Sequence, residues 1–303
     1  MIYTITLNPS IDYIVSIPQV ALGELNKMDH DLKLPGGKGI NVSRILHEVG
    51  KDTVALGFLG GFTGGFISDW LTKEGVRSDF IQIREDTRIN IKLKSEEETE
   101  INGRGPSISP EESKKLMEKL SHLTPEDTVV LSGSKPPSLP DDYYLQLVEL
   151  ITKQGASFII DTTGQELFTA LPLNPLLVKP NKEELAELFQ VSITSEADVL
   201  TYGNKLLELG AEHVIVSMAG EGALLFTKNG TYKGINPKGT VKNSVGAGDS
   251  MIAGFTGEYM QSKDPIQAFK MGIASGSATA FSDDLAKKQD IHSLLNQIEI
   301  KPL

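Results

Sequence analysis

Residues 243–254 read NSVGAGDSMIAG, a glycine turn followed by a carboxylate and the first turn of an apolar helix. Gly246 and Gly248 allow the backbone to bend tightly and to approach a ligand closely. The amides that open the helix have no acceptor within it, and such a helix start can bind anions. Asp249 therefore has two interpretations, an acid favoured by the helix dipole or a base beside a phosphoryl group. The spacing alone leaves both open.

The composition indicates a globular protein and excludes several function classes. A chain of 303 residues can bury a sizeable core, and we favour one α/β domain with an elaboration. Its 29 basic and 40 acidic residues give a net charge of −11, which argues against a nucleic-acid or anionic membrane surface. The absence of cysteine excludes disulfides, thiolate zinc sites and a cysteine nucleophile. Without a membrane-spanning run or a signal-peptide pattern, we expect a cytoplasmic protein.

The first candidate ligand residue stands near the N-terminus. Residues 2–7 form a β-prone run that Asn8 and Pro9 end, and a second strand is expected from Tyr13. Asp12 is therefore expected just beyond a strand end, where ligands of open α/β sheets gather. An aspartate in such a turn is also commonly a turn former only.

A second glycine turn precedes a helix at residues 35–41, which read PGGKGIN. The glycine spacing matches neither a Walker A loop nor a dinucleotide fingerprint. Lys38 could neutralise a phosphate and Asn41 could hydrogen-bond a sugar hydroxyl. Alternatively, they are a solvated lysine and an ordinary polar residue of a first helical turn.

A third glycine-rich segment, residues 60–65, follows a run at 54–59 that is expected to be a buried strand. We expect the segment itself to be a loop, and residues 66–73 to form a helix that Gly75 ends. The paired glycines suggest a close approach of a ligand or of another backbone segment.

A hairpin is expected next, because residues 89–94 alternate apolar and polar side chains and residues 99–102 can return as its second strand. With the strand near Tyr13, it could form a small sheet that covers a site or pairs with another subunit, since its apolar face needs burial. Arg88 and Arg104 flank this hairpin. Arginine suits bidentate phosphate contacts, although a single arginine at a strand end is usually solvated.

From residue 110 onward, the expected elements alternate between helix and strand. Helices are expected over residues 110–120, 140–153 and 165–171, and strands over 129–131 and 158–160. This alternation predicts parallel strands covered by helices.

Two further segments have both a functional and a structural interpretation. Asn181 and Glu184 are three apart at an expected helix start, so they could hold hydrated magnesium or form an N-cap with its capping box. Residues 217–223 stand between two expected strands. Their glycines permit a turn that contacts a nucleotide, and equally an ordinary hairpin.

Three motifs together resemble those of the PfkB (ribokinase-like) family of sugar kinases, over essentially the whole chain. They are PGGKGINV at residues 35–42, KPN from residue 179 with Glu184, and VGAGDS at residues 245–250. TLNPSID from residue 6 and TRINIKL from residue 87 are further similar to the phosphosugar branch, closest to its bacterial 1-phosphofructokinases.

This resemblance implies a fold and a reaction. The fold is a ribokinase-like three-layer α/β/α core with a mostly parallel sheet and a small β-sheet lid. We expect a single kinase domain over residues 1–303, with lid strands from about 11–34 and 87–104. The reaction is ATP-dependent phosphorylation of fructose 1-phosphate to fructose 1,6-bisphosphate with Mg²⁺. Tagatose 6-phosphate and fructose 6-phosphate are alternative substrates, and a non-catalytic sugar-phosphate or nucleotide sensor is an alternative of another class. The expected partners exclude nucleic acid and membranes, and the lid sheet is a candidate homodimer contact.

Residue roles also follow from the resemblance. The catalytic group is Asp249 as the base, with the amides of Gly246, Ala247 and Gly248 as the anion hole. Sugar-phosphate binding falls to Asp12, Gly36, Gly37, Lys38, Asn41, Arg88, Asn90 and Arg104. Nucleotide binding falls to Lys179, Asn181, Ser217, Met218, Ala219, Gly220, Glu221, Gly222 and Gly248. Glu184 would organise Mg²⁺ through water. Many family members have an acid where this chain has Asn243, so no cation-ligand role is carried over there.

Overall fold

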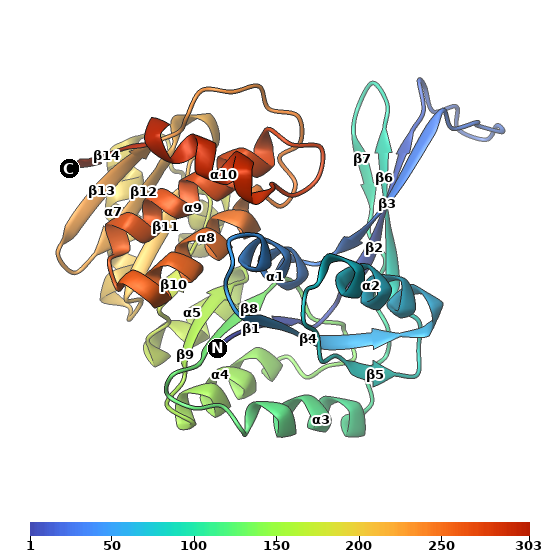
Figure 1. Ribbon diagram of the computed structural model, residues 1–303, viewed down its shortest axis with the longest axis horizontal. Helices are drawn as coiled ribbons and strands as arrows, with labels where there is room; N and C mark the ends of the chain where they lie inside the picture. The colour runs from blue at the N-terminus through green and yellow to red at the C-terminus, as the bar shows by residue number, and fades with distance from the viewer.

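The computed structural model describes residues 1–303, which form two sheets (Figure 1). The large sheet has ten strands in the order β14-β13-β12-β11-β10-β9-β8-β1-β4-β5. From β11 to β5 all neighbours are parallel, whereas β11 to β14 pair antiparallel. The strands are β1 (Ile2–Thr6), β4 (Thr53–Gly60), β5 (Ile81–Ile83), β8 (Thr128–Ser132), β9 (Ser157–Asp161), β10 (Leu177–Val178), β11 (His213–Ser217), β12 (Ala223–Thr227), β13 (Gly230–Ile235) and β14 (Glu299–Pro302).

Helices cover both faces of this sheet. Along β8, Val129 and Leu131 pack into one core cluster and Val130 into another, as expected for a parallel strand buried on both faces. One face carries α1 (Lys38–Glu48), α2 (Gly61–Glu74), α8 (Ala247–Ser262), α9 (Pro265–Ala280) and α10 (Lys288–Leu294). The other carries α3 (Pro110–Leu120), α4 (Tyr143–Lys153), α5 (Gly164–Ala170), α6 (Lys182–Phe189) and α7 (Glu196–Glu208). The predicted three-layer α/β/α class is confirmed.

The small sheet projects from one end of the molecule, as Figure 1 shows. Its strands, in spatial order, are β3 (His30–Gly36), β2 (Ser10–Ser16), β6 (Arg88–Lys94) and β7 (Thr99–Ile101). The central pair β2 and β6 is parallel and places Asp12 beside Asn90. None of the helices in the molecule combines the length and hydrophobicity that a bilayer crossing requires.

Two local predictions were wrong. Asp12 lies inside β2 rather than beyond a strand end, because the chain pairs with both β3 and β6 from Ser10 onward. The segment 60–65 is not a loop, since α2 begins at Gly61. Thr63 is buried there, and its hydroxyl donates to the carbonyl of Thr87 (2.7 Å). Tertiary packing of this kind stabilises a helical turn that glycine propensity disfavours.

Core packing on α4 leads to a stability prediction. Leu147 is fully buried, so Leu147→Ala removes apolar contacts and leaves a cavity. We expect the free energy of unfolding to fall by about 2–5 kcal/mol in urea titrations. Glu149→Ala changes an exposed residue of the same helix and should alter it by less than about 0.5 kcal/mol. Equal losses in both variants would contradict this assignment of the core.

Candidate active site

A cleft of about 770 Å³ opens at the carboxyl ends of the parallel strands. Successive strands supply one lining residue each near these ends: Thr6, Ser132, Asp161, Lys179 and Ser217. Ligands of open α/β sheets bind at this edge. Only one of the 25 lining residues, Val245, is hydrophobic, so the cleft suits a strongly polar ligand.

The glycine turn of residues 243–249 places the start of α8 at this cleft. Gly246 is the N-cap residue and has φ 79°, a left-handed conformation that favours glycine. No side chain caps the helix, and the amides of Gly248 and Asp249 have no acceptor in the protein. The Ala247 amide, which was expected in the anion hole, donates instead to the Ser244 carbonyl (3.2 Å). Unpaired amides at the positive end of a sixteen-residue helix form a site for an anionic group.

Asp249 lies in the first turn of α8 and is 7% exposed. One of its oxygens accepts a hydrogen bond from Asn41 Nδ2 (2.8 Å). Burial, together with the negative charge of Asp161, raises the pKa of Asp249 to about 6, even though Asn41 and two nearby lysines act in the opposite direction. A carboxyl group with a pKa just below neutrality suits a general base.

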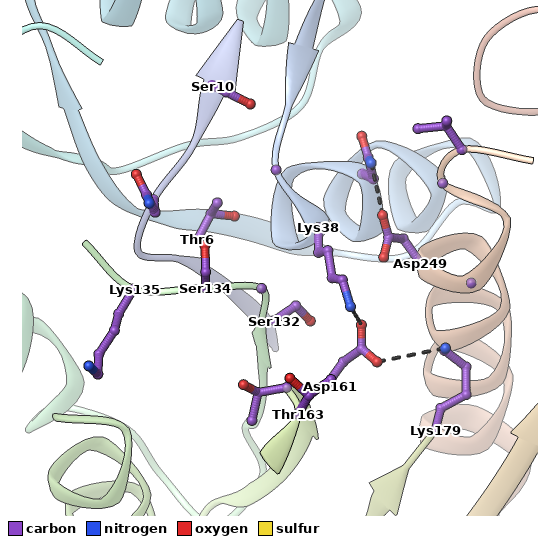
Figure 2. Close-up of a pocket in the computed structure, with 18 of the residues that line it drawn as sticks. Thr6, Ser10, Lys38, Ser132, Ser134, Lys135, Asp161, Thr163, Lys179 and Asp249 are labelled. Atoms are coloured by element: carbon purple, nitrogen blue, oxygen red, sulfur yellow. Dashed lines mark hydrogen bonds and ion pairs between the residues drawn. The ribbon is translucent and has the colours of Figure 1, made fainter. Parts of the chain in front are cut away.

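Asp161 sits between two lysines that come from different elements (Figure 2). Its carboxylate accepts from Lys38 Nζ (3.0 Å) and forms an ion pair with Lys179 Nζ (3.7 Å). Burial alone would raise the pKa of Asp161, but the charges of Lys179 and Lys38 outweigh it and hold that pKa below its usual value. Lys38 likewise has a raised pKa, because its burial is outweighed by Asp161 and Asp249. Lys38 is therefore cationic within the cleft.

The small sheet supplies the opposite wall. Asn90 Nδ2 donates to Asp12 Oδ1 and to Ser10 Oγ (3.1 Å each), which fixes the Asp12 carboxylate toward the cleft. Arg88 donates through Nε to the Asn8 carbonyl (3.2 Å) and through Nη1 to the Gly103 carbonyl (2.9 Å). Its Nη2 group has no partner within the protein and is free to bind a ligand.

Three buried polar side-chain atoms of the cleft wall have no hydrogen-bond partner. They are Thr6 Oγ1, Asn8 Oδ1 and Ser132 Oγ, whose residues are at most 5% exposed. Buried polar groups are nearly always paired, and an unpaired one costs free energy. These atoms therefore indicate hydrogen bonds to a polar ligand or to water.

Beside the lysines, Asn181 and Glu184 form a reciprocal capping box at the start of α6. Asn181 Oδ1 accepts from the Glu184 amide (2.7 Å), and Glu184 Oε2 accepts from the Asn181 amide (2.9 Å). The structural interpretation of this pair is thus present, and both residues also line the cleft. Residues 217–223 connect the antiparallel strands β11 and β12, so the hairpin interpretation holds for that segment as well.

The cleft brings together most of the residues that the sequence singled out. Its lining includes Asp12, Gly37, Lys38, Asn41, Arg88, Asn90, Lys179, Asn181, Glu184, Ser217, Gly246, Gly248 and Asp249. Outside the lining are Gly36, Arg104, Met218, Ala219, Gly220, Glu221, Gly222 and Ala247. Gly36 supports Asp12 from behind, because a Cβ there would lie 2.4 Å from Asp12 Oδ1. Arg104 is exposed at the end of the small sheet.

Several lining residues were missed by the sequence reasoning. They are Thr6, Asn8, Ser10, Ser132, Gly133, Ser134, Lys135, Asp161, Thr162, Thr163, Glu166 and Val245. Ser132 and Asp161 each stand directly after an apolar run that was expected to be a parallel strand. The strand-end rule would have identified both of them.

Comparisons with known proteins agree with this geometry. A family model described as "pfkB family carbohydrate kinase" matches residues 5–289. The chain is 48% identical to the 1-phosphofructokinase of Bacillus subtilis over 303 residues, covering 100% of both chains. It is 36% identical to the D-tagatose-1-phosphate kinase of Bacillus licheniformis, again covering 100% of both. Its fold is similar to the crystal structure of a putative phosphofructokinase from Staphylococcus aureus, with a TM-score of 0.88, 42% identity, and coverage of 100% of this chain and 99% of that chain.

The raised pKa of Asp249 predicts that its ionisation destabilises the ligand-free fold. The folded protein keeps the proton up to about pH 6, whereas the unfolded chain releases it near 3.8, so stability falls as pH rises between these values. Asp249→Asn should therefore raise the free energy of unfolding by on the order of 3 kcal/mol at about pH 7.5 and by nearly nothing near pH 4. Urea titrations at both pH values measure this difference.

The control for this prediction has the opposite sign. Asp198 is partly exposed, and hydrogen bonds from Ser195 and Thr194 hold its pKa below the usual value. Asp198→Asn should lower stability at neutral pH. If Asp249→Asn gave the same gain at both pH values, the effect would not come from ionisation of the carboxyl group.

Proposed function

The chain belongs to the pfkB family of carbohydrate kinases, and we propose that it is an ATP-dependent kinase that converts fructose 1-phosphate into fructose 1,6-bisphosphate. The observation that carries the proposal is one juxtaposition. A buried carboxylate with a pKa of about 6 lies at a helix start with unpaired amides, in a cleft that also holds cationic lysines. Deprotonation of an alcohol and binding of a phosphoryl group need these two features side by side.

In the proposed reaction, the oxygen of the sugar's 6-hydroxyl attacks the γ-phosphorus of ATP, and Asp249 accepts the proton of that hydroxyl. The new P–O bond forms at the sugar, the bond between the γ-phosphorus and its bridging oxygen breaks, and ADP leaves. A positioned base typically contributes ~10²–10⁴-fold to the rate. Asn41 holds the carboxylate by its hydrogen bond and so orients the oxygen that takes the proton.

The start of α8 would bind the phosphoryl group during transfer. Phosphoryl transfer depends mainly on positioning and on stabilising negative charge. The free amides of Gly248 and Asp249 are fixed donors, and Lys179 Nζ lies 3.1 Å from the position a Cβ of Gly248 would take. A side chain at Gly248 would therefore occupy space between the helix start and this cation.

We assign the sugar's existing phosphate to Arg88 and Lys38, which both line the cleft. Arginine and lysine are suitable phosphate partners, and Arg88 Nη2 is free. The sugar hydroxyls would pair with Asp12 and Asn90, and with the unpaired oxygens of Thr6, Asn8 and Ser132.

The residues present also fit a magnesium ion that accompanies ATP. Mg²⁺ is usually held by one or two carboxylates, by waters and by substrate phosphates rather than by a protein cage. No group of three or more His, Cys, Asp or Glu residues forms such a cage. Glu184 keeps one oxygen free of the capping box, so we assign it to a metal-bound water. When bound, the ion would neutralise charge on the phosphates.

We propose fructose 1-phosphate as the substrate because the 1-phosphofructokinase of Bacillus subtilis is similar to this chain over the full length of both chains. The D-tagatose-1-phosphate kinase is also similar over its full length. Fructofuranose carries an exocyclic hydroxymethyl group on either side of the ring oxygen. Similar pockets can therefore take the existing phosphate at either end, and tagatose 6-phosphate and fructose 6-phosphate stay as alternatives.

The small sheet is proposed as a lid that excludes water from ATP, since it carries Asp12, Arg88 and Asn90 on the cleft wall. Its other face exposes Ile89 and Ile101, which share a side of the sheet because Ile101 pairs with Ile91. An exposed apolar sheet face is a protein interface candidate. We propose that a second copy of the chain covers it.

A coupled ADP-release assay across a substrate panel tests the proposed function. We expect the wild type to turn over fructose 1-phosphate faster than fructose 6-phosphate, tagatose 6-phosphate or unphosphorylated fructose. Asp249→Asn should lower kcat by ~10²–10⁴-fold while the KM for ATP changes little. Absence of sugar-dependent ADP release in the wild type would favour a sensor, and near-normal turnover in Asp249→Asn would remove Asp249 from the base role.

Arg88→Ala should weaken binding of the sugar phosphate rather than the chemical step. Charge-assisted hydrogen bonds contribute about 1.5–3 kcal/mol, so we expect the sugar-phosphate KM to rise by roughly 10- to 100-fold with a smaller change in kcat. Arg84→Ala alters an exposed arginine outside the cleft and should leave both parameters unchanged. The same assay on Arg104→Ala tests whether that exposed arginine reaches the phosphate. An unchanged KM in Arg88→Ala would move the phosphate site elsewhere.

A further inference from the structure

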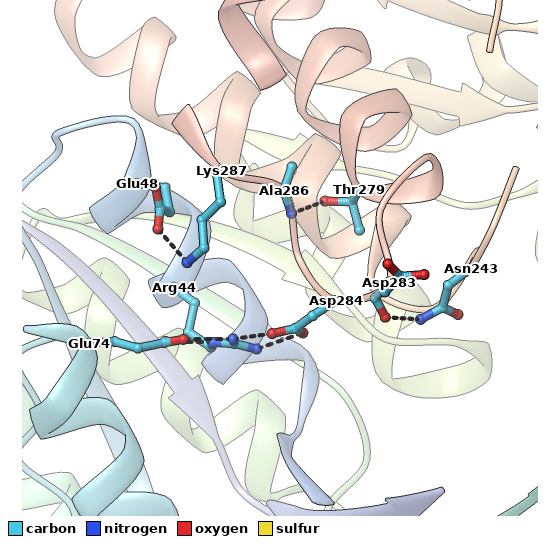
Figure 3. Close-up of polar contacts among 9 residues, drawn as sticks. All are labelled: Arg44, Glu48, Glu74, Asn243, Thr279, Asp283, Asp284, Ala286 and Lys287. Atoms are coloured by element: carbon cyan, nitrogen blue, oxygen red, sulfur yellow. Dashed lines mark hydrogen bonds and ion pairs between the residues drawn. The ribbon is translucent and has the colours of Figure 1, made fainter. Parts of the chain in front are cut away.

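The glycine turn of residues 243–249, which we call the catalytic turn, packs against the connection between α9 and α10 (Figure 3). This connection comprises residues 281–287, and we call it the supporting loop. Leu285 packs directly beneath Gly246, since a Cβ at Gly246 would lie 2.7 Å from Leu285 Cδ2. The side chain of Asn243, at the start of the turn, donates to the Asp283 carbonyl (3.3 Å). This loop therefore supports the backbone segment that carries the free amides.

The supporting loop is also linked, through Thr279, to the residue that follows the proposed base. Thr279, near the end of α9, has its hydroxyl 2.8 Å from Ser250 Oγ. The same hydroxyl accepts from the Ala286 amide (3.1 Å). Ser250 and Thr279 are fully or almost fully buried, so this connection is shielded from water. A displacement of the loop would thus be transmitted to both sides of Asp249.

Arg44 on α1 holds the supporting loop in place through Asp284. Its guanidinium donates to both oxygens of Asp284 (Nη2 to Oδ2 2.6 Å, Nη1 to Oδ1 3.2 Å) and to both oxygens of Glu74, at the end of α2 (2.7 and 2.8 Å). The Arg44 side chain is 4% exposed. Its hydrogen bonds to the two carboxylates outweigh the effect of burial and keep the pKa of Arg44 above its usual range.

From these contacts we propose that the Arg44–Asp284 ion pair is a positioning device for phosphoryl transfer, which fixes the glycine turn relative to α1. The proposal rests on the proposed kinase function. Arg44 follows Asn41 by one helical turn, and Asn41 holds the Asp249 carboxylate. Helix α1 therefore fixes both the orientation of the proposed base and the position of the turn that carries the anion-binding amides.

A bidentate guanidinium contact is suited to this task. Two parallel N–H···O bonds define direction as well as distance, whereas a lysine ammonium acts as a point charge. The loop has two further ionic contacts, Lys287 with Glu48 (2.7 Å) and Asp283 with Lys242 (3.4 Å), but their lysines are 56% and 53% exposed. Exposed pairs hold geometry weakly. The Arg44 guanidinium, by contrast, is almost fully buried, and its partner carboxylate is 34% exposed. Its bidentate contact is thus the one that determines where the loop sits.

The test compares Asp284→Asn, Arg44→Lys and Lys287→Met in steady-state assays with ATP and the sugar phosphate that the wild type prefers. Misplacement of reacting groups by about 1 Å can cost up to ~10²-fold in rate. We expect kcat in Asp284→Asn and Arg44→Lys to fall by roughly 10- to 100-fold, with both KM values within about twofold of wild type. Lys287→Met, which breaks an exposed contact of the same loop, should keep kcat within about twofold.

Rates are taken per folded molecule, at a temperature well below the unfolding midpoint of each variant. A purely structural role would lower that midpoint and leave kcat of the folded protein unchanged, which would overturn the proposal. Loss of the fold in both Asp284→Asn and Arg44→Lys would overturn it as well, because the pair would then serve global stability. An inactive wild type would instead contradict the kinase function itself, so the two failures are distinguishable.

Discussion

The site depends on keeping one carboxylate ionisable although it is largely buried. Asp249 is buried close to a second acid, and this environment favours its protonated form. Asn41 and the neighbouring lysines supply the opposing stabilisation of the charged form. The balance leaves the pKa of Asp249 near the pH at which a base can both hold and release a proton. A more hydrated position would lose the raised pKa, and a more apolar one would keep the proton bound.

Asp161 holds two lysines in the cleft of a chain whose net charge is negative. The chain has a net charge of −11, whereas ATP and a sugar phosphate are both anions. Lys38 and Lys179 converge on Asp161, so two cations are kept ordered at the cleft without ligand. The two lysines together balance the charges of Asp161 and Asp249 when both acids are ionised. An incoming phosphate therefore meets preorganised cationic donors, despite the repulsive field of the whole protein.

Much of the fold and of the site could be predicted from the sequence, because both follow local rules. The α/β alternation predicted the parallel sheet, and glycine turns before helices identified Lys38, Asn41 and Asp249. Asp161 and Ser132 were within reach of the strand-end rule but lacked a glycine signal. Strand β14 was not predicted, since it pairs with β13 only through tertiary contact, whereas β13 follows β12 by a short hairpin turn and was within reach of local rules. Arg44 and Asp284 are separated by 240 residues, and no local pattern indicates that they meet.

The support of the catalytic turn explains why residues outside the cleft matter to it. A glycine turn gives close backbone approach, but glycine also has the widest conformational freedom, so its own sequence does not define one geometry. The start of α8 has no capping side chain, which would occupy the amides that we assign to a phosphoryl group. A capping side chain would normally restrain the helix start. Here Leu285 and the Asp283 carbonyl restrain it instead, through their contacts with the glycine turn. A helix start that stays open to a ligand must be positioned by its neighbours.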